Sequence, residues 1–149
     1  MTDLQRLKDK LIQLRLKTMA QNLEVTLKEA SEKNRDTLFV INHLVHLEAE
    51  HRWHNAIKLR FQQSKLNEKL TIDQFDFNHH KSRKNQKTHI LNLLNLNFVK
   101  ELKDVIFIGN PGTGKTFLAK CIAYAACNAN IKVLFTTAID MINQLIAAE

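Results

Sequence analysis

A single glycine-rich segment constrains the fold of this chain more than any other feature of its sequence. Residues 109–116 read G-N-P-G-T-G-K-T and fit the pattern G-x-x-x-x-G-K-[ST], the phosphate-binding loop of nucleoside triphosphatases. All three glycines and the only proline of the chain lie in this segment, which we call the glycine loop. The apolar run at residues 105–108 predicts a buried strand before it, and apolar spacing predicts a helix from 116 to about 127. Strand, loop and helix in this order are the context that the motif requires.

The residue types of the glycine loop predict how it would hold a nucleotide. Its glycines let the backbone curl around an anion, so that successive N–H groups form a nest, and the following helix adds its positive end. We expect Lys115 to reach the β- and γ-phosphates of ATP and the Thr116 hydroxyl to ligate Mg²⁺. The alternative is a glycine turn with an incidental lysine, which the flanking strand and helix patterns disfavour. The candidate nucleotide-binding residues are Gly109, Asn110, Pro111, Gly112, Thr113, Gly114, Lys115, Thr116 and Phe117.

The rest of the chain is predicted to be helical before the glycine loop and mixed after it. Apolar spacing predicts one helix over residues 3–30 and a second over 36–64. Residues 131–135 read as a second strand, and Thr137 with Asp140 resembles the capping box that starts a helix. We therefore predict an α/β fold, with a helical N-terminal region followed by the start of a P-loop domain with a parallel sheet. The expected domains are residues 1–70, the helical region; 71–100, a connector with a basic patch and a short helix; and 101–149, the incomplete start of the ATPase domain.

The charge of the chain points to an anionic partner. The formal net charge is +7 and the pI is about 9.5, which favours nucleic acid as a partner and carries no information on fold. The most basic stretch, residues 79–89, holds Lys81, Arg83, Lys84 and Lys87 and no acidic residue. These four residues are candidate DNA contacts. The alternative, an exposed loop whose charges contact nothing, is equally open.

Composition also bears on the cellular location. No apolar run approaches the ~20 residues of a membrane span, and the N-terminus lacks the apolar core of a secretory signal. Cys121 and Cys127 lack C-x-x-C spacing, and free cysteines suit a reducing compartment. We expect a cytoplasmic protein without a membrane partner.

One Glu48-x-x-His51 motif occurs without the second copy that a di-iron site needs, so metal binding there is disfavoured.

Several of these features occur together in a known family. The connector ending in Phe75-Asp76-Phe77, the basic stretch and short helix after it, and the run D-V-I-F-I-G-N-P-G-T-G-K-T-F-L-A at residues 104–119 resemble the IstB-like helper ATPases of insertion-sequence transposition. These are relatives of the DnaC helicase loaders in the AAA+ class, and the similarity includes residues 16–19 and 48–52. The resemblance implies an AAA+-type sheet domain and a protein that binds ATP and Mg²⁺, assembles on DNA as a homo-oligomer and assists a transposase. The family usually has histidine after the loop threonine, where this chain has Phe117.

The resemblance also shows which parts of an AAA+ ATPase are missing. Only 33 residues follow Thr116, and none of them forms an apolar strand that ends in paired acids, as a Walker B strand does. Sensor residues and an arginine finger are missing too. We therefore expect the N-terminal portion of a helper ATPase, truncated after its second strand–helix unit, with negligible hydrolysis of its own. A DnaC-like helicase loader, or an interaction fragment with a remnant nucleotide site, are the alternatives.

Overall fold

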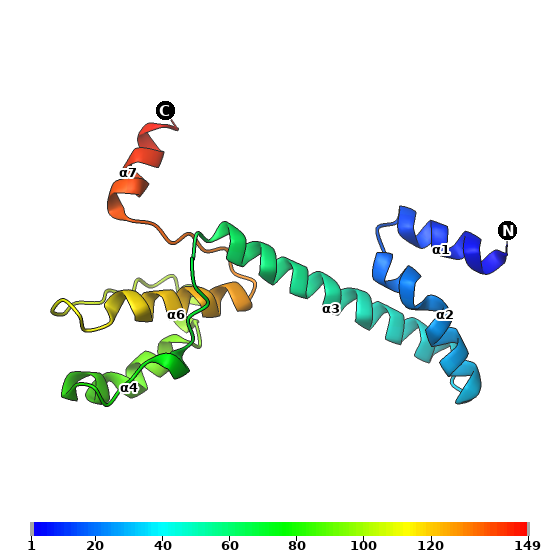
Figure 1. Ribbon diagram of the computed structural model, residues 1–149, viewed down its shortest axis with the longest axis horizontal. Helices are drawn as coiled ribbons and strands as arrows, with labels where there is room; N and C mark the ends of the chain where they lie inside the picture. Colours follow the sequence, from blue (N-terminus) through cyan, green and yellow to red (C-terminus); the bar gives the residue numbers. More distant parts are fainter. Residues whose placement is uncertain (1, 149) are drawn as a thin grey trace. The chain divides into compact units, whose positions relative to one another are not determined.

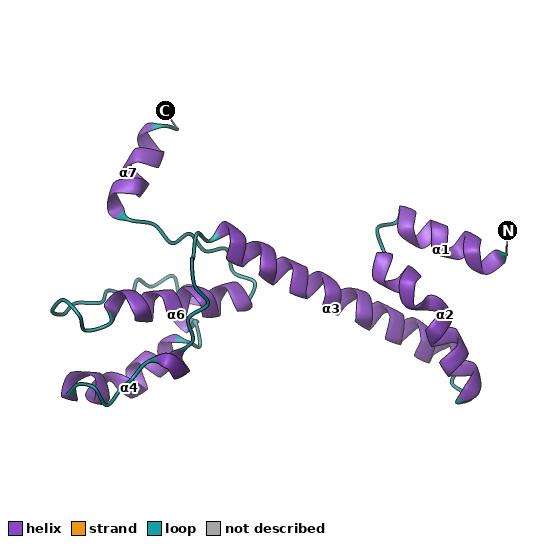
Figure 2. Cartoon of the chain, in the orientation of Figure 1, coloured by secondary structure: helices purple, strands orange, loops and turns teal. Residues whose placement is uncertain are grey.

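The structure is a computed structural model that describes residues 2–148, and the described residues form helices and loops (Figures 1 and 2). They divide into two compact units, Met1–Ala56 and Ile57–Glu149. The helices are α1 (Asp3–Gln13), α2 (Lys17–Glu32), α3 (Thr37–Gln63), a 3-10 turn (Ile72–Gln74), α4 (Lys81–Leu93), α5 (Asn97–Lys100), α6 (Lys115–Asn128) and α7 (Ala138–Ile146). None of the described helices has the length and apolar character needed to cross a membrane.

The predicted parallel sheet is absent from the described residues, so the α/β prediction is wrong for this structure (Figure 2). Residues 105–108 and 131–135, which were expected to be strands, are loops without ladder hydrogen bonds between them. Ile106 and Ile108 are 80% and 91% exposed, although a parallel strand would bury both faces. The physical reason is that an apolar run predicts burial, whereas a strand exists only where a neighbouring backbone pairs with it.

Three helices, α1, α2 and α3, occupy the residues that were predicted to form two, and the first unit contains α1, α2 and most of α3. The chain turns between α1 and α2 at Arg15, which has the left-handed φ of 61°. Because this break brings α1 against α2, one apolar cluster forms from both helices and the start of α3. The buried members are Leu23, Ala30, Val40 and Leu44, with Leu4, Leu11, Met19 and Phe39 packed against them. The break was missed because the apolar spacing continues through it and no glycine or proline marks it.

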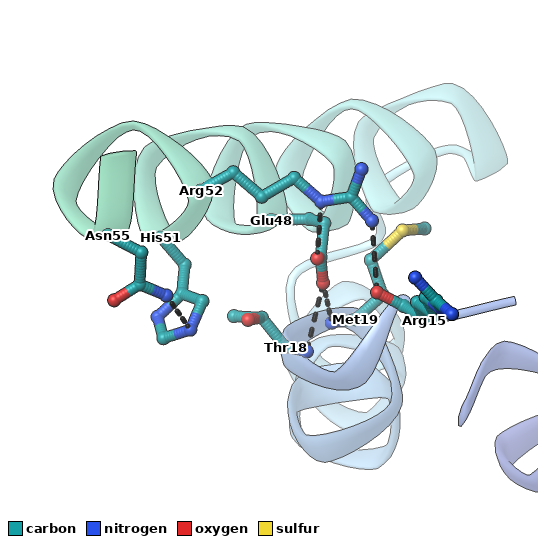
Figure 3. A network of polar contacts seen from close by, with 7 residues as sticks. All are labelled: Arg15, Thr18, Met19, Glu48, His51, Arg52 and Asn55. Atoms are coloured by element: carbon teal, nitrogen blue, oxygen red, sulfur yellow. Dashed lines mark hydrogen bonds and ion pairs between the residues drawn. The ribbon is translucent and has the colours of Figure 1, made fainter. Parts of the chain in front are cut away.

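A buried carboxylate explains how the start of α2 is stabilised (Figure 3). The residue before α2 is leucine and offers no side-chain cap. Instead, Glu48 of α3 accepts hydrogen bonds from the backbone N–H groups of Thr18 and Met19 at 2.9 and 3.2 Å. Its other oxygen accepts from Nε of Arg52 at 2.9 Å, and Arg52 also donates to the Arg15 carbonyl. Glu48 and Arg52 thus form an ion pair, and their contacts link α3 to the turn between α1 and α2.

The second unit has its main apolar cluster around the Phe75–Phe77 connector. Phe75, Ile90 of α4 and Leu118 of α6 are buried together, so the cluster joins the connector to both helices. Ile72, Phe77, Phe107 and Phe117 pack against these three residues. The cluster thus holds the glycine loop, which leads into α6, beside α4 and the connector.

Three predicted helix boundaries can be compared with the structure. Helix α6 begins at Lys115, within the glycine loop, and ends at Asn128, close to the predicted range of 116 to about 127. Asn130 follows it with a left-handed φ of 59°, a conformation that asparagine adopts at helix ends. Helix α7 begins after Thr137, whose hydroxyl accepts from the Asp140 N–H, as predicted. The short helix predicted in the connector begins as α4 at Lys81, so residues 81–89 of the basic stretch lie on a helix rather than in an exposed loop.

Candidate functional site

The last residues of the glycine loop, Lys115 and Thr116, form the start of α6, where backbone donors have no acceptor within the helix. Gly112 and Gly114 have φ of 78° and 89°, a left-handed conformation that glycine adopts at low cost. The first backbone bond of α6 runs from the Leu118 N–H to the Gly114 carbonyl. The N–H groups of the three preceding residues, Lys115, Thr116 and Phe117, therefore lack an acceptor within the helix. Unpaired N–H groups at the N-terminus of a helix favour the binding of an anion.

Two polar side chains of the loop, those of Lys115 and Thr113, donate to backbone carbonyls of the loop itself. Lys115 Nζ donates to the carbonyl oxygens of Gly109 and Asn110, each at 2.8 Å. The Thr113 hydroxyl donates to the same Asn110 oxygen at 2.9 Å, and the Thr113 N–H points to it at 3.4 Å. One partly negative oxygen thus attracts a lysine, a hydroxyl and an N–H group. The same donors suit an oxygen of a phosphate, which carries more charge and would compete with the carbonyl.

Phe75 of the connector packs directly against the loop. A Cβ placed on Gly114 would lie 2.6 Å from Cε2 of the Phe75 ring, a distance too short for any side chain. Gly114 is therefore required for two reasons, its positive φ and its contact with the ring. Phe117 also packs against Phe75, with ring centroids 5.6 Å apart and the ring planes tilted by 32°. The Phe117 side chain thus belongs to the apolar cluster, and only its backbone N–H is placed at the start of α6.

Arg83 of α4 contacts the glycine loop as well. Its Nη2 donates to the Gly112 carbonyl at 3.3 Å, and its Nη1 donates to the Asp76 carbonyl at 3.1 Å. The guanidinium carbon lies 4.6 Å from the centre of the Phe75 ring. Its Nε–H is buried and has no partner among the described residues, a cost that the other contacts must offset. Arg83, which was predicted from the sequence as a DNA contact, thus lies at the candidate nucleotide site.

The other three basic residues of the patch do not share this position. Lys81 and Lys84 are exposed on α4, and the Lys87 ammonium lies 5.5 Å from the centre of the Phe77 ring. An open groove of about 720 Å³ runs beside the loop. Its lining includes Asn110, Thr113 and Lys115 from the loop and Arg83, Gln86 and His89 from α4. Asn110, Thr113 and Lys115 of the predicted site thus line one groove, whereas the four basic residues of the predicted patch contact the loop, an aromatic ring or solvent.

The two cysteines and the histidines offer no competing site in the described part of the chain. Cys121 and Cys127 are free and buried in α6. Burial raises the pKa of the Cys121 thiol to about 11 and also raises that of Cys127, so neither is a nucleophile near neutral pH. No cluster of three or more His, Cys, Asp or Glu side chains suited to a metal ion occurs among residues 2–148.

Sequence reasoning identified the loop but missed two of the residues that support it. Phe75 was noted only as part of the connector, and Arg83 only as part of the basic stretch. The available signal was the aromatic pair Phe75 and Phe77, because large apolar side chains in a polar connector are expected to pack on something. Which element they would contact depends on the path of the chain, and local spacing does not encode that path.

The comparison with protein families decides the relationship. The family described as IstB-like ATP binding protein matches residues 9–149. The chain belongs to this family. The resemblance drawn from the connector, the glycine loop and the N-terminal helices is therefore confirmed.

Individual relatives in the family are proteins of insertion sequences. A protein of Geobacillus stearothermophilus, named as the putative ATP-binding protein of insertion sequence IS5376, is 33% identical over 136 residues. The corresponding IS232 protein of Bacillus thuringiensis subsp. berliner is 28% identical over 141 residues, and the IS21 protein of Pseudomonas aeruginosa is 27% identical over 139. The alignments cover 91%, 95% and 93% of this chain but only 53%, 56% and 52% of those proteins. The chain thus spans about half the length of these curated relatives.

Proposed function

We propose that this chain supplies the nucleotide-binding loop of an ATP-binding helper protein of DNA transposition. The observation that carries the proposal is the convergence of the Lys115 ammonium, the Thr113 hydroxyl and the Thr113 N–H on one loop oxygen, at the start of α6. The chain belongs to the IstB-like ATP binding protein family, and its relatives are named as ATP-binding proteins of insertion sequences.

The donor set fits the phosphates of ATP. The positive φ of Gly112 and Gly114 lets the backbone curl, and the free N–H groups at the start of α6 supply further donors. Lys115 would exchange its two carbonyl acceptors for the β- and γ-phosphates, and Asn110 and Thr113 would line the same cradle. The Thr116 hydroxyl, exposed in the first turn of α6, would contribute one ligand to a Mg²⁺ ion held mainly by the nucleotide. The ion would neutralise charge on the phosphates.

The proposed partners of the complete protein are DNA and a transposase. The net charge of +7 favours a polyanion, and Lys81 and Lys84 present exposed ammonium groups on α4. If these lysines contact phosphates, the binding they contribute would be independent of base sequence, because phosphate contacts carry no direct sequence information. A homo-oligomer that assembles on DNA in the cytoplasm would bring several such helices to one duplex.

A binding experiment with matched lysine variants tests the nucleotide site. Purified wild-type chain, Lys115→Ala and Lys132→Ala would be titrated with a fluorescent ATP analogue in the presence of Mg²⁺. Lys132 is exposed and lies outside the loop, so it controls for the loss of one positive charge. We expect Lys115→Ala to weaken binding at least about tenfold, since it removes a charged donor, and Lys132→Ala to bind as the wild type does. Equal affinities for the wild type and Lys115→Ala would refute the proposal.

A further inference from the structure

We propose that Arg83 is a positioning residue of the nucleotide site, which fixes the direction of the Gly112 peptide and so orients the donors of the glycine loop. The inference rests on the proposed function of that loop and assigns it a residue outside the motif. Arg83 lies on α4, 26 residues before the glycine loop begins, and would act through Gly112 rather than on the nucleotide itself.

The guanidinium is held by three contacts that come from two different segments. Asp76 and Phe75 belong to the connector and provide a carbonyl acceptor and an aromatic face. Gly112 belongs to the loop and provides the second carbonyl, at 3.3 Å. Because the guanidinium is planar and its donors have a fixed geometry, the contacts with the connector determine where the Gly112 oxygen is held.

The direction of this carbonyl matters for phosphate binding. In a trans peptide the C=O and the following N–H point in opposite directions. The carbonyl of Gly112 points to Arg83, and the N–H of Thr113, in the same peptide unit, points to the Asn110 oxygen at 3.4 Å. A rotation of this peptide would turn the carbonyl oxygen into the cradle, where it would repel phosphate.

Packing alone does not prevent that rotation. A Cβ on Gly112 would meet no atom within 4 Å, so this part of the loop is not enclosed by neighbours. Glycine also has the widest choice of φ and ψ, so the intrinsic preference of the backbone is weak here. Among the described residues, no other side chain from outside the glycine loop donates a hydrogen bond to it.

The composition of the chain gives a direct spectroscopic test. Since the three glycines all lie in the loop, labelling untagged full chain with glycine that carries ¹³C at the carbonyl carbon gives carbonyl resonances from Gly109, Gly112 and Gly114 alone, and the Gly112 carbonyl is the group that Arg83 contacts. Spectra would be recorded for the wild type, Arg83→Gln, Arg83→Lys and the control Lys84→Gln, which changes an exposed charge on the same helix. Far-UV circular dichroism of each variant would verify that the helices are retained. We expect both Arg83 variants to move the Gly112 resonance, because neither side chain keeps the forked pair of donors, and Lys84→Gln to leave it in place.

Titration of the same four proteins with MgATP separates positioning from simple attraction by charge. Positioning predicts that the dissociation constant rises about tenfold in both Arg83→Gln and Arg83→Lys, as expected when one charge-assisted hydrogen bond is removed. An unmoved Gly112 resonance in Arg83→Gln, or wild-type ATP affinity in Arg83→Lys, would overturn the inference. If the wild type itself failed to bind ATP, the proposed function would be wrong, and the Gly112 resonance would still decide whether Arg83 sets the loop conformation.

Discussion

Removing the charge of Glu48 is expected to destabilise the first unit measurably. Glu48 is only 6% exposed, and its carboxylate accepts from the Thr18 and Met19 N–H groups and from Arg52. Hydrogen bonds to charged groups contribute about 1.5–3 kcal/mol, and those between neutral groups about 0.5–1.5 kcal/mol. Glu48→Gln keeps the shape and one acceptor oxygen, and the half-exposed Arg52 can regain water. We therefore expect the free energy of unfolding to fall by about 2 kcal/mol.

The assay can use the only tryptophan of the chain as its probe. Trp53 lies in the first unit on the same helix as Glu48, so its fluorescence during urea unfolding reports on this unit. The matched control is Glu50→Gln, because Glu50 is exposed and, within residues 2–148, its carboxylate pairs only with the exposed His46. Such a surface pair contributes at most about 1 kcal/mol.

The same comparison carries a pH dependence with a defined sign. Burial tends to raise the pKa of Glu48, but the hydrogen bonds from Arg52, Met19 and Thr18 outweigh it and lower the pKa below its ordinary value of 4.5. A lowered pKa in the folded state contributes stability above pH 4.5, which is lost as the pH falls through the folded value. The difference in the free energy of unfolding between the wild type and Glu48→Gln should be constant from about pH 7 to 5 and shrink below pH 4.5. Two results would refute this reasoning: equal stability of Glu48→Gln and Glu50→Gln at neutral pH, or a difference in unfolding free energy between the wild type and Glu48→Gln that does not shrink in acid.

Three further predictions concern the second unit. Gly114→Ala should lower the melting temperature measured by circular dichroism more than Gly112→Ala does, because the new methyl at position 114 would meet the Phe75 ring. At position 112 alanine meets no atom, and only the positive φ is unfavourable, at a cost of about 1–2 kcal/mol. Equal decreases would contradict the contact with Phe75. Cys121 and Cys127 should react with a thiol reagent at pH 8 only after denaturant is added, since both are buried and their pKa values are raised; rapid reaction of the folded chain would contradict this. Replacing Lys81 and Lys84 by alanine should weaken binding to a fluorescent DNA duplex and reduce the log–log salt slope by about 0.9 for each DNA phosphate that is no longer neutralised; an unchanged slope would remove α4 from the DNA surface.

The motif and the helices could be predicted from sequence because their signals are local. The glycine loop is defined by eight adjacent residues, and α3, α6 and α7 follow from apolar spacing and from the Thr137 cap. The predicted strands failed because pairing depends on a neighbour, and exposure of Ile106 and Ile108 shows that none covers them among the described residues.

The support of the loop was unpredictable for a related reason. Arg83 contacts the loop because α4 already starts at Lys81. On a helix the basic residues point in different directions around the axis, so one of them can face the loop while others face solvent. The break at Arg15 likewise depends on Glu48 and Arg52, which are more than 30 residues away in sequence. Both cases need contacts between distant segments, which spacing within one segment does not specify.

The most direct test of the account is a titration of the ¹⁵N-glycine-labelled wild-type chain with MgATP, with adenosine as a control that lacks phosphates. We expect the resonances of Gly109, Gly112 and Gly114 to shift together and saturate with MgATP, because the loop exchanges its own carbonyl acceptors for phosphate oxygens. Adenosine should leave them in place, and Lys115→Ala should suppress the shifts. The claim that this loop binds the phosphates would be contradicted by either of two results. The glycine resonances could stay unchanged at MgATP concentrations that saturate binding in the fluorescence titration, or they could shift equally with adenosine.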